Sequence, residues 1–272
     1  MERVFTNISW YRFTSIDDAP ELRAPLLDMC LSLGLRGTIL LSEEGMNLNL
    51  CGSEQAIEDI IAHLEQDDRF SGMDVKRSHS ERQTFSRMLV KVKREIITLR
   101  RPEIRPEIFT GPSITSELLV RWYEQGRDFT MLDARNRFEV RMGRFEDALD
   151  LDITSFEDFY EAIATLDPEL CTKPLVVYCT GGIRCEKASP VLLDAGFEQV
   201  YQLKGGILSH FERRGGSHWQ GECFVFDARV ALDPRLEETD TVQCFACREP
   251  VNAQEQRSAD YTEGESCPRC AC

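Results

Sequence analysis

The stretch Val176-Val177-Tyr178-Cys179-Thr180-Gly181-Gly182-Ile183-Arg184-Cys185-Glu186-Lys187 decides the fold of the second half of the chain. Its apolar start predicts a buried strand that ends at Tyr178, and the residues from Ile183 onward predict a helix. The two glycines between them permit a tight loop, whose free N–H groups and helix dipole favour negative charge at its centre. Together with Arg184 they should lower the pKa of Cys179 below the usual value of about 8.5. The sequence therefore predicts a nucleophilic thiolate at the end of a strand.

The spacing within this loop narrows its chemistry. Four residues separate Cys179 from Arg184, whereas protein tyrosine phosphatases have five, so the loop suits a single sulfur atom better than a phosphate. It resembles the active-site loop of a rhodanese domain, whose cysteine carries a persulfide, and the resemblance implies that Cys179 and Arg184 are catalytic. A buried cysteine in an ordinary α/β turn is the alternative, but it leaves the glycines and the arginine unexplained. The other members of the predicted active-site loop are Thr180, Gly181, Gly182, Ile183 and Cys185.

Length and composition set the outer limits. A chain of 272 residues with 42% hydrophobic residues suggests about two domains with real cores. No apolar run reaches the roughly 18 residues of a membrane span, and the start of the chain has no basic-then-apolar signal pattern. We expect a cytoplasmic protein with no membrane segment, in which the eleven cysteines serve catalysis and metal binding more than disulfides. The net charge of −15 argues, for the chain as a whole, against nucleic acid.

Residues 1–101 read as a small α/β domain. Apolar periodicity and turn residues give the order βαββαβ with one added strand, which predicts a ferredoxin-like or acylphosphatase-like fold. Strands are expected at 5–13, 38–41, 46–51, 73–78 and 88–99, and helices at 20–33 and after a cap at Ser53.

The end of this domain concentrates positive charge. Ten basic and four acidic residues lie between Asp74 and Arg105, a local charge of +6 in an acidic chain. A face of this kind would hold phosphates, and Lys91, Lys93 and Arg94 are the predicted substrate-binding residues. The alternative is a solvated edge strand whose lysines discourage aggregation.

Residues 102–113, with three prolines, read as a linker, and residues 114–220 as the rhodanese domain. Strands that alternate with helices imply a parallel sheet, and the cysteine loop follows the C-terminal end of one strand, where such sheets bind ligands. Pro190 falls inside the helix that follows the loop, so we expect that helix to be kinked or shortened.

Several motifs are spread along most of the chain: Gly37 through Leu41, Glu44 through Asn47, Val90 through Leu99, Asp133 through Glu139, Cys179 through Lys187 and Gly221 through Val230. Together they resemble one subfamily, the rhodanese-type tRNA uridine hydroxylases. The resemblance implies an enzyme that inserts oxygen at C5 of the wobble uridine of tRNA, with molecular oxygen as co-substrate and Cys179 as the essential cysteine, and that gives 5-hydroxyuridine. One departure is Leu48-Asn49-Leu50-Cys51, where relatives carry a small, glycine-containing run.

The C-terminal segment, residues 221–272, carries two CxxC pairs. Cys244 with Cys247 and Cys267 with Cys270 supply the four thiolates of a tetrahedral zinc site, so we expect a structural zinc. The polar stretch between the pairs could not fold alone, and metal binding would order it. A disordered thiol tail and a redox pair are the alternatives, and Cys272 is a possible substitute ligand.

Three functions remain open at this stage. The first is the tRNA hydroxylase, in which the Cys179 thiolate adds to C6 of uridine or a Cys179 persulfide is the active agent. The second is a sulfurtransferase that takes sulfane sulfur from a donor through Cys179, and the third is a zinc-bearing binding protein with a regulatory thiol. Cys185 could resolve an oxidised Cys179 or simply be buried. No GxGxxG motif follows a strand, so neither flavin nor nicotinamide is expected.

Overall fold

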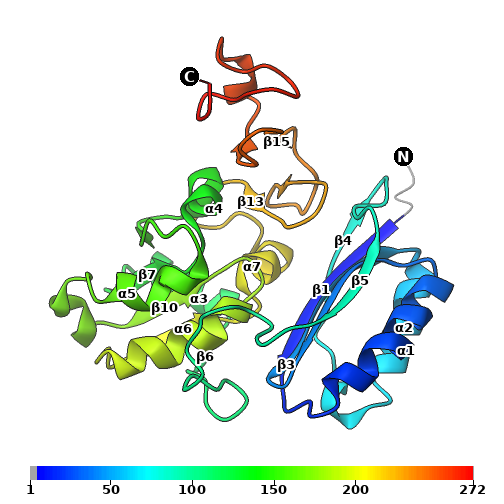
Figure 1. Cartoon of the computed structure of the whole chain (residues 1–272). Helices are drawn as coiled ribbons and strands as arrows, with labels where there is room; N and C mark the ends of the chain where they lie inside the picture. Colours follow the sequence, from blue (N-terminus) through cyan, green and yellow to red (C-terminus); the bar gives the residue numbers. More distant parts are fainter. Residues whose placement is uncertain (1–4, 272) are drawn as a thin grey trace.

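A computed structural model describes residues 5–271 of the chain. Figure 1 shows three parts: a sheet with two helices on one side, a second sheet surrounded by helices, and a C-terminal segment that extends from them. This arrangement confirms the predicted α/β class with two domains and a separate cysteine-rich end. Cys272, the predicted substitute ligand, lies outside the described residues. In the part of the chain that the structure describes, no helix is both long and apolar enough to cross a membrane.

The N-terminal sheet has the order β4-β1-β3-β2-β5. All neighbouring strands are antiparallel except β2 and β5, which are parallel. The strands β4, β1, β3 and β2 are those of the predicted ferredoxin-like unit, and the added strand, β5, lies at the edge of the sheet beside β2. The elements are β1 (Phe5–Phe13), α1 (Ala19–Ser32), β2 (Arg36–Ser42), β3 (Gly45–Gly52), α2 (Glu54–Leu64), β4 (Lys76–Ser80) and β5 (Met88–Val92).

Alternation along the strands gives this sheet two unlike faces. Ile8 and Trp10 of β1 join the apolar core beneath α1 and α2, together with Leu48 of β3. The residues of β1 that alternate with Ile8 and Trp10, such as Ser9 and Tyr11, point to the opposite face of the sheet because successive side chains alternate. Figure 1 shows α1 and α2 on the side of the sheet away from the second domain. The polar face is therefore turned toward the second domain.

The strand predicted over residues 88–99 is too long, because β5 ends at Val92. Its neighbour β2 ends at Ser42, so no ladder remains beyond the bond from the Lys93 N–H to the Leu41 carbonyl oxygen. The chain then leaves the sheet and crosses to the second domain. Side chains replace the ladder along this crossing: Glu44 accepts from the Ile96 N–H at 2.7 Å.

The second domain has a parallel sheet, as predicted, and its five strands lie in the order β6-β11-β10-β7-β9. Its central strand, β10, is buried on both sides: Val177 belongs to one apolar core and Val176 to the other. The elements are β6 (Ser113–Ile114), α3 (Ser116–Glu124), β7 (Thr130–Asp133), α4 (Arg137–Met142), β8 (Gly143–Phe145), β9 (Leu149–Asp150), α5 (Phe159–Ile163), β10 (Leu175–Tyr178), α6 (Ile183–Asp194), β11 (Val200–Leu203) and α7 (Gly206–Arg214).

Pro190 does not end α6, which runs on to Asp194. A proline in a helix leaves the carbonyl four residues earlier without its usual donor. Here that carbonyl belongs to Glu186, and the Thr110 hydroxyl donates to it over 3.1 Å. The segment before β6 thus supplies the missing hydrogen bond, which explains why the expected shortening does not occur.

Short strands follow α7 and form three two-stranded sheets. They are β12 (Trp219–Gly221) against β8, β13 (Cys223–Phe224) against β14 (Ala231–Leu232), and β15 (Val242–Gln243) against β16 (Pro250–Val251). The turn between β13 and β14 reaches the N-terminal domain, where the Ala228 N–H donates to the Thr84 carbonyl oxygen at 3.0 Å. This segment therefore closes the gap between the two domains on one side.

Candidate active site

The loop that carries Cys179 joins the C-terminal end of β10 to the N-terminus of α6. Gly182 has a φ of 97°, a left-handed conformation that favours glycine, and its N–H donates to the Cys179 Sγ over 3.2 Å. A Cβ added at Gly182 would lie 2.9 Å from the Tyr11 hydroxyl oxygen. Position 182 therefore favours glycine for two reasons: the loop has a left-handed conformation there, and the N-terminal domain approaches it closely.

The environment of Cys179 favours the thiolate. Its side chain is only 1% exposed. Burial acts to raise its pKa, but the Cys185 thiol, the Arg184 charge and the N–H groups of Arg184 and Gly182 together lower the pKa of Cys179 to about 6. Cys179 is thus mostly ionised at neutral pH, as the sequence predicts.

Arg184 has a buried partner that the sequence did not reveal. Its guanidinium donates to both carboxylate oxygens of Glu139, each over 2.8 Å. Burial acts against the charge, but Glu139 holds the pKa of Arg184 above its ordinary value. Arg184 therefore supports the thiolate through its charge, while its hydrogen-bonding fork is occupied by Glu139.

A chain of polar contacts fixes Glu139 in turn. Arg135 is fully buried against Asp133 at the end of β7, with 2.6 Å between the guanidinium and a carboxylate oxygen. Glu139 then accepts from the Asn136 N–H at 3.1 Å and from the Thr180 hydroxyl at 3.3 Å. The Asp133-Ala134-Arg135 motif thus positions α4, and α4 positions the partner of Arg184.

Cys185 is fully buried in the first turn of α6, six residues after Cys179. Burial and the neighbouring charges of Cys179 and Glu186 raise the pKa of Cys185 well above its ordinary value. A thiol that keeps its proton can donate to the Cys179 thiolate. Of the two roles predicted for Cys185, burial is what the structure describes, and a resolving role stays a prediction.

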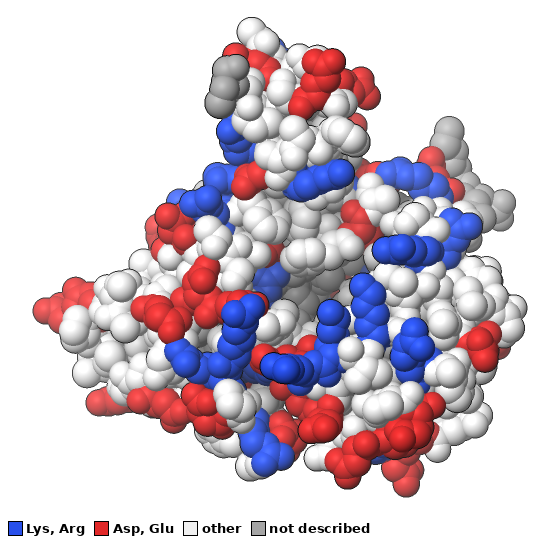
Figure 2. Space-filling view, viewed as in Figure 1, with Lys and Arg blue, Asp and Glu red and all other residues white. Residues whose placement is uncertain are grey.

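The loop opens into a cavity of about 390 Å³. One wall is the active-site loop, with Cys179, Thr180, Gly181, Ile183 and Arg184. The opposite wall is the polar face of the N-terminal sheet, and the third comes from the segment after β13, where Phe226 is 60% exposed. Figure 2 shows a hollow in the middle of this face of the molecule, with Lys and Arg side chains gathered along its rim. The polar face contributes Asn7, Ser9, Tyr11, Asn47, Asn49, Lys76 and Ser78.

The predicted substrate-binding residues occupy different places. Lys93 borders the cavity of Cys179 and a neighbouring groove, whereas Arg94 borders the groove alone. Lys91 is exposed on β5 and borders neither recess. The groove also contains three arginines of the same basic segment: Arg100, Arg101 and Arg105.

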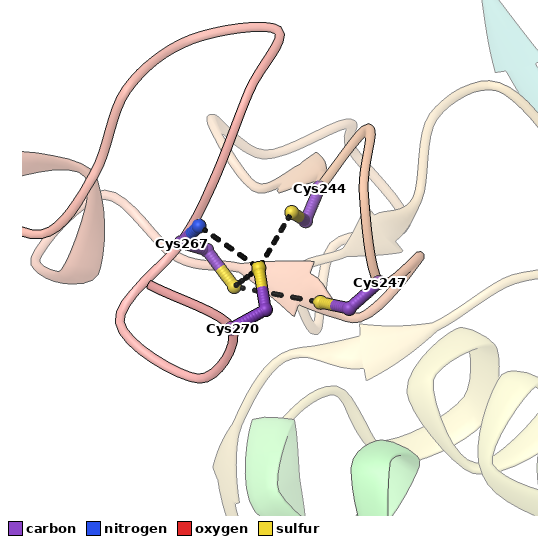
Figure 3. Close-up of side chains that lie close together, drawn as sticks. All are labelled: Cys244, Cys247, Cys267 and Cys270. Carbon is purple, nitrogen blue, oxygen red and sulfur yellow. Dashed lines mark hydrogen bonds between the residues drawn. The ribbon is translucent and has the colours of Figure 1, made fainter. Parts of the chain in front are cut away.

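The four cysteines of the two CxxC pairs come together at the C-terminal end of the chain (Figure 3). Their sulfur atoms all lie within 4.8 Å of one another, with Cys244 3.7 Å from Cys270 and Cys247 3.5 Å from Cys267. A tetrahedral zinc with Zn–S bonds of about 2.3 Å requires sulfur atoms about 3.8 Å apart. The four thiols therefore fit such an ion.

Comparison with known proteins agrees with this architecture. Residues 5–96 match the UPF0176 acylphosphatase-like domain, and residues 115–210 match the rhodanese-like domain. Curated proteins named tRNA uridine(34) hydroxylase are similar over 97% of this chain: the Cupriavidus necator protein is 51% identical, with 95% of its length covered, and the Ralstonia nicotianae protein is 47% identical, with 96% covered. The chain belongs to the tRNA uridine(34) hydroxylase family. This membership confirms the family resemblance carried by the sequence motifs.

A solved structure that matches the chain covers less of it than these tRNA uridine(34) hydroxylase relatives do. The solution structure of a rhodanese-like domain from Anabaena sp. is 26% identical and covers 40% of this chain and 79% of its own, with a TM-score of 0.33.

The structure adds four residues to the site of this hydroxylase family member that the sequence did not single out as functional: Glu139, Tyr11, Lys76 and Phe226. Glu139 carried a faint signal, because it stands three residues after Asn136, and an Asn followed by Glu at this spacing is typical of a helix start, where the carboxylate accepts from the backbone. Tyr11 and Lys76 lie in strands more than 100 residues before Cys179, so no local pattern connects them with the loop.

Lys187 turned out to hold the domains together. Its Nζ lies 2.8 Å from a Glu44 carboxylate oxygen and 2.7 Å from one of Glu95, and both carboxylates belong to the N-terminal part of the chain. Beside it, Glu186 accepts from the Tyr11 hydroxyl at 3.2 Å. The charges at the start of α6 therefore fix the position of the N-terminal sheet over the loop.

Proposed function

We propose that this protein hydroxylates the uridine at position 34 of tRNA at C5 and gives 5-hydroxyuridine. The observation that carries the proposal is the similarity to tRNA uridine(34) hydroxylases at about half identity over nearly the whole chain, both domains included. A sulfurtransferase needs the rhodanese-like domain alone, whereas these relatives share the N-terminal domain and the C-terminal segment as well. The hydroxylase function is therefore favoured.

In this proposal Cys179 is the nucleophile. A buried thiolate with a pKa of about 6 stands ready at neutral pH to add to C6 of the uracil ring, which makes C5 electron-rich. Molecular oxygen is the proposed source of the added atom. Arg184 and the loop donors keep the thiolate ionised, and the cavity walls shield it from water. A persulfide on Cys179 is the alternative agent, and it would require a sulfur donor.

The tRNA would lie over the basic groove. Lys93 and Arg94 offer positive charge next to the cavity, which suits the phosphates around an unstacked anticodon base. The exposed ring of Phe226 borders the same cavity and offers a stacking surface for that base. Because tRNA is the substrate, the proposal includes a cytoplasmic location.

The cysteine cluster has a structural role in this proposal. Cys244, Cys247, Cys267 and Cys270 would hold one zinc ion, which would supply the free energy that orders the polar segment between the pairs. The cluster stands apart from Cys179 in the fold, so the ion would take no part in the chemistry of the loop.

The test is mass spectrometry of tRNA nucleosides from cells that lack the protein and then receive the intact chain or a Cys179→Ser variant. The intact chain should restore 5-hydroxyuridine and its derivatives, and Cys179→Ser should restore none. A modification that is indifferent to the protein would refute the proposal and return the chain to the sulfurtransferase reading. Full product from Cys179→Ser would remove Cys179 from the chemistry.

A further inference from the structure

The active-site loop offers no free cationic side chain that could pair with negative charge on a bound ligand. Both oxygens of Glu139 occupy the guanidinium of Arg184, each at 2.8 Å, so this fork is not free to bind a second anion. Any negative charge that appears on a ligand above Cys179 needs a cation from another part of the cavity wall.

Lys76 of β4 is such a cation. It borders the same cavity as Cys179, is only partly exposed, and holds its Nζ 5.3 Å from the centre of the Tyr11 ring. Within residues 5–271, no carboxylate lies within ion-pair distance of this lysine. A partly buried ammonium without an ion pair costs free energy, and we infer that the anion that pairs with it arrives with the substrate.

Two other cations that border the cavity are already paired. Arg77, the next residue along β4, lies 2.6 Å from Glu58, and Arg229 lies 2.6 Å from Asp227. Lys93 also borders the cavity but is exposed, where water screens its charge. Lys76 is therefore the cation best placed to act on charge inside the cavity.

Packing fixes where Lys76 lies. A Cβ added at Gly205, in the turn before α7, would sit 3.5 Å from the Lys76 Cε, and one added at Gly182 would sit 2.9 Å from the Tyr11 hydroxyl oxygen. The two N-terminal strands thus bring Tyr11 and Lys76 against both turns that frame Cys179. The domain interface, held by Lys187 with Glu44 and Glu95, keeps them there.

We propose that Lys76 stabilises the negative charge that leaves Cys179 when its thiolate adds to the uracil ring. This inference rests on the proposed hydroxylase function. In the addition, a sulfur lone pair forms the S–C6 bond, the C5=C6 π pair becomes the C4=C5 bond, and the C4=O4 π pair moves onto O4. One negative charge thus moves from sulfur to O4, and the Lys76 ammonium receives it there. No oxidant is consumed in this step.

The titration of Lys76 supplies a distinctive readout. Burial lowers the pKa of Lys76, while Asp74, Cys179, Glu186 and Glu212 act to raise it. Tyr11, which also faces it, has a pKa raised well above the ordinary value, so the phenol stays neutral. The rate of addition should fall at alkaline pH as Lys76 loses its proton, and Lys76→Arg should move this fall to higher pH.

The experiment measures addition apart from oxidation. A tRNA with 5-fluorouridine at position 34 reports the S–C6 bond as a covalent adduct on Cys179, detected by mass spectrometry. Lys76→Met should slow adduct formation and single-turnover product formation about 100-fold. The Kd of Lys76→Met for tRNA should stay within about twofold of that of the unaltered protein, and Lys76→Arg should restore most of the rate. Lys173→Met is the control and should match the unaltered protein. Lys173 forms an ion pair with Asp128, 3.0 Å away, at the other end of β10.

The outcomes separate the two proposals. If the unaltered protein forms no 5-hydroxyuridine, the hydroxylase function fails. If it does, and Lys76→Met forms adduct and product at the unaltered rate, the role of Lys76 is refuted while the function stands. A Lys76→Met defect that follows lost tRNA affinity, or one that Lys76→Arg shares, would also refute it. Rates of iodoacetamide reaction at Cys179, compared at a pH where the thiolate is fully formed in every variant, verify that each variant keeps an intact loop.

Discussion

The rhodanese sheet and the N-terminal sheet border the same cavity but present different parts of themselves to it. The rhodanese sheet offers the C-terminal end of β10, where a loop of backbone donors surrounds Cys179. The N-terminal sheet offers a whole face, from which side chains such as Tyr11 and Lys76 project. At the loop, contiguous residues make the Cys179 sulfur reactive. On the sheet face, residues dispersed along the chain form a wall of the cavity. The two regions should therefore respond differently to substitution.

The largest effect on the free energy of unfolding is expected at the buried Glu139–Arg184 pair beneath the active-site loop. Glu139→Ala removes the only carboxylate that pairs Arg184 among the described residues, and an uncompensated buried charge costs about 3–5 kcal/mol in the free energy of unfolding. Urea unfolding measures the loss, with the exposed Glu169→Ala as the matched control. A loss below about 1 kcal/mol would mean that water or another group reaches Arg184.

A smaller effect should appear where the two regions touch. Gly182 and Gly196 have nearly equal φ values, 97° and 96°, but an added Cβ meets the Tyr11 hydroxyl oxygen at Gly182 and nothing within 4 Å at Gly196. Both alanine variants bear a backbone cost of about 1–2 kcal/mol. Gly182→Ala should cost more in urea unfolding, and a Tyr11→Phe background should remove most of the excess. Equal costs for the two variants would deny the close approach of the domains.

The reactivity of the two regions should differ with pH. The pKa of Cys179 is lowered to about 6, whereas burial raises the pKa of Cys30, in the N-terminal core, to about 12. The iodoacetamide reaction at Cys179 should rise as pH increases through 6 and level off by about 8, while Cys30 stays unreactive. Peptide mass spectrometry distinguishes them. Cys185→Ala should move the Cys179 profile to higher pH, because one donor to the thiolate is lost.

The smallest effect per residue should come from the exposed rim. Lys93→Glu and Arg94→Glu should each weaken tRNA binding and reduce the slope of log K against log salt by about 1, as expected for one lost phosphate contact. Arg121→Glu changes an exposed arginine on α3 outside both recesses and should leave the slope unchanged. A slope that ignores Lys93 and Arg94 would place the tRNA elsewhere.

The same contrast explains what the sequence could predict. The loop of Cys179 was readable because its strand, glycines, arginine and helix are contiguous, and the cysteine cluster because its spacing is fixed by the metal it suits. The order of the N-terminal strands followed from periodicity and turn residues. The end of β5 at Val92 was missed because it depends on where its partner β2 stops.

The partners across the cavity could not be predicted. Tyr11 reaches the loop only because the N-terminal sheet docks with its polar face inward, and docking is decided by contacts distant in sequence. Glu139 lay inside a motif that the sequence singled out, but its pairing with Arg184 depends on how α4 packs beside the loop. Boundaries drawn from composition share this weakness: Leu99 and Ile104, which precede the residues assigned to the rhodanese domain, pack in its core.

The crossing between the domains has a consequence for how the protein can vary. Glu95 bonds Lys187 on one side, while Glu95 and Glu44 accept from the N–H groups of Leu99 and Ile96 on the other. The length of the crossing, residues 93–99, therefore determines how the N-terminal sheet lies over the active-site loop. An insertion or deletion within the crossing would shift the register of these contacts and misalign the sheet face with the loop. The two domains accordingly cannot be exchanged as independent modules, and their relative placement is inherited together with the crossing.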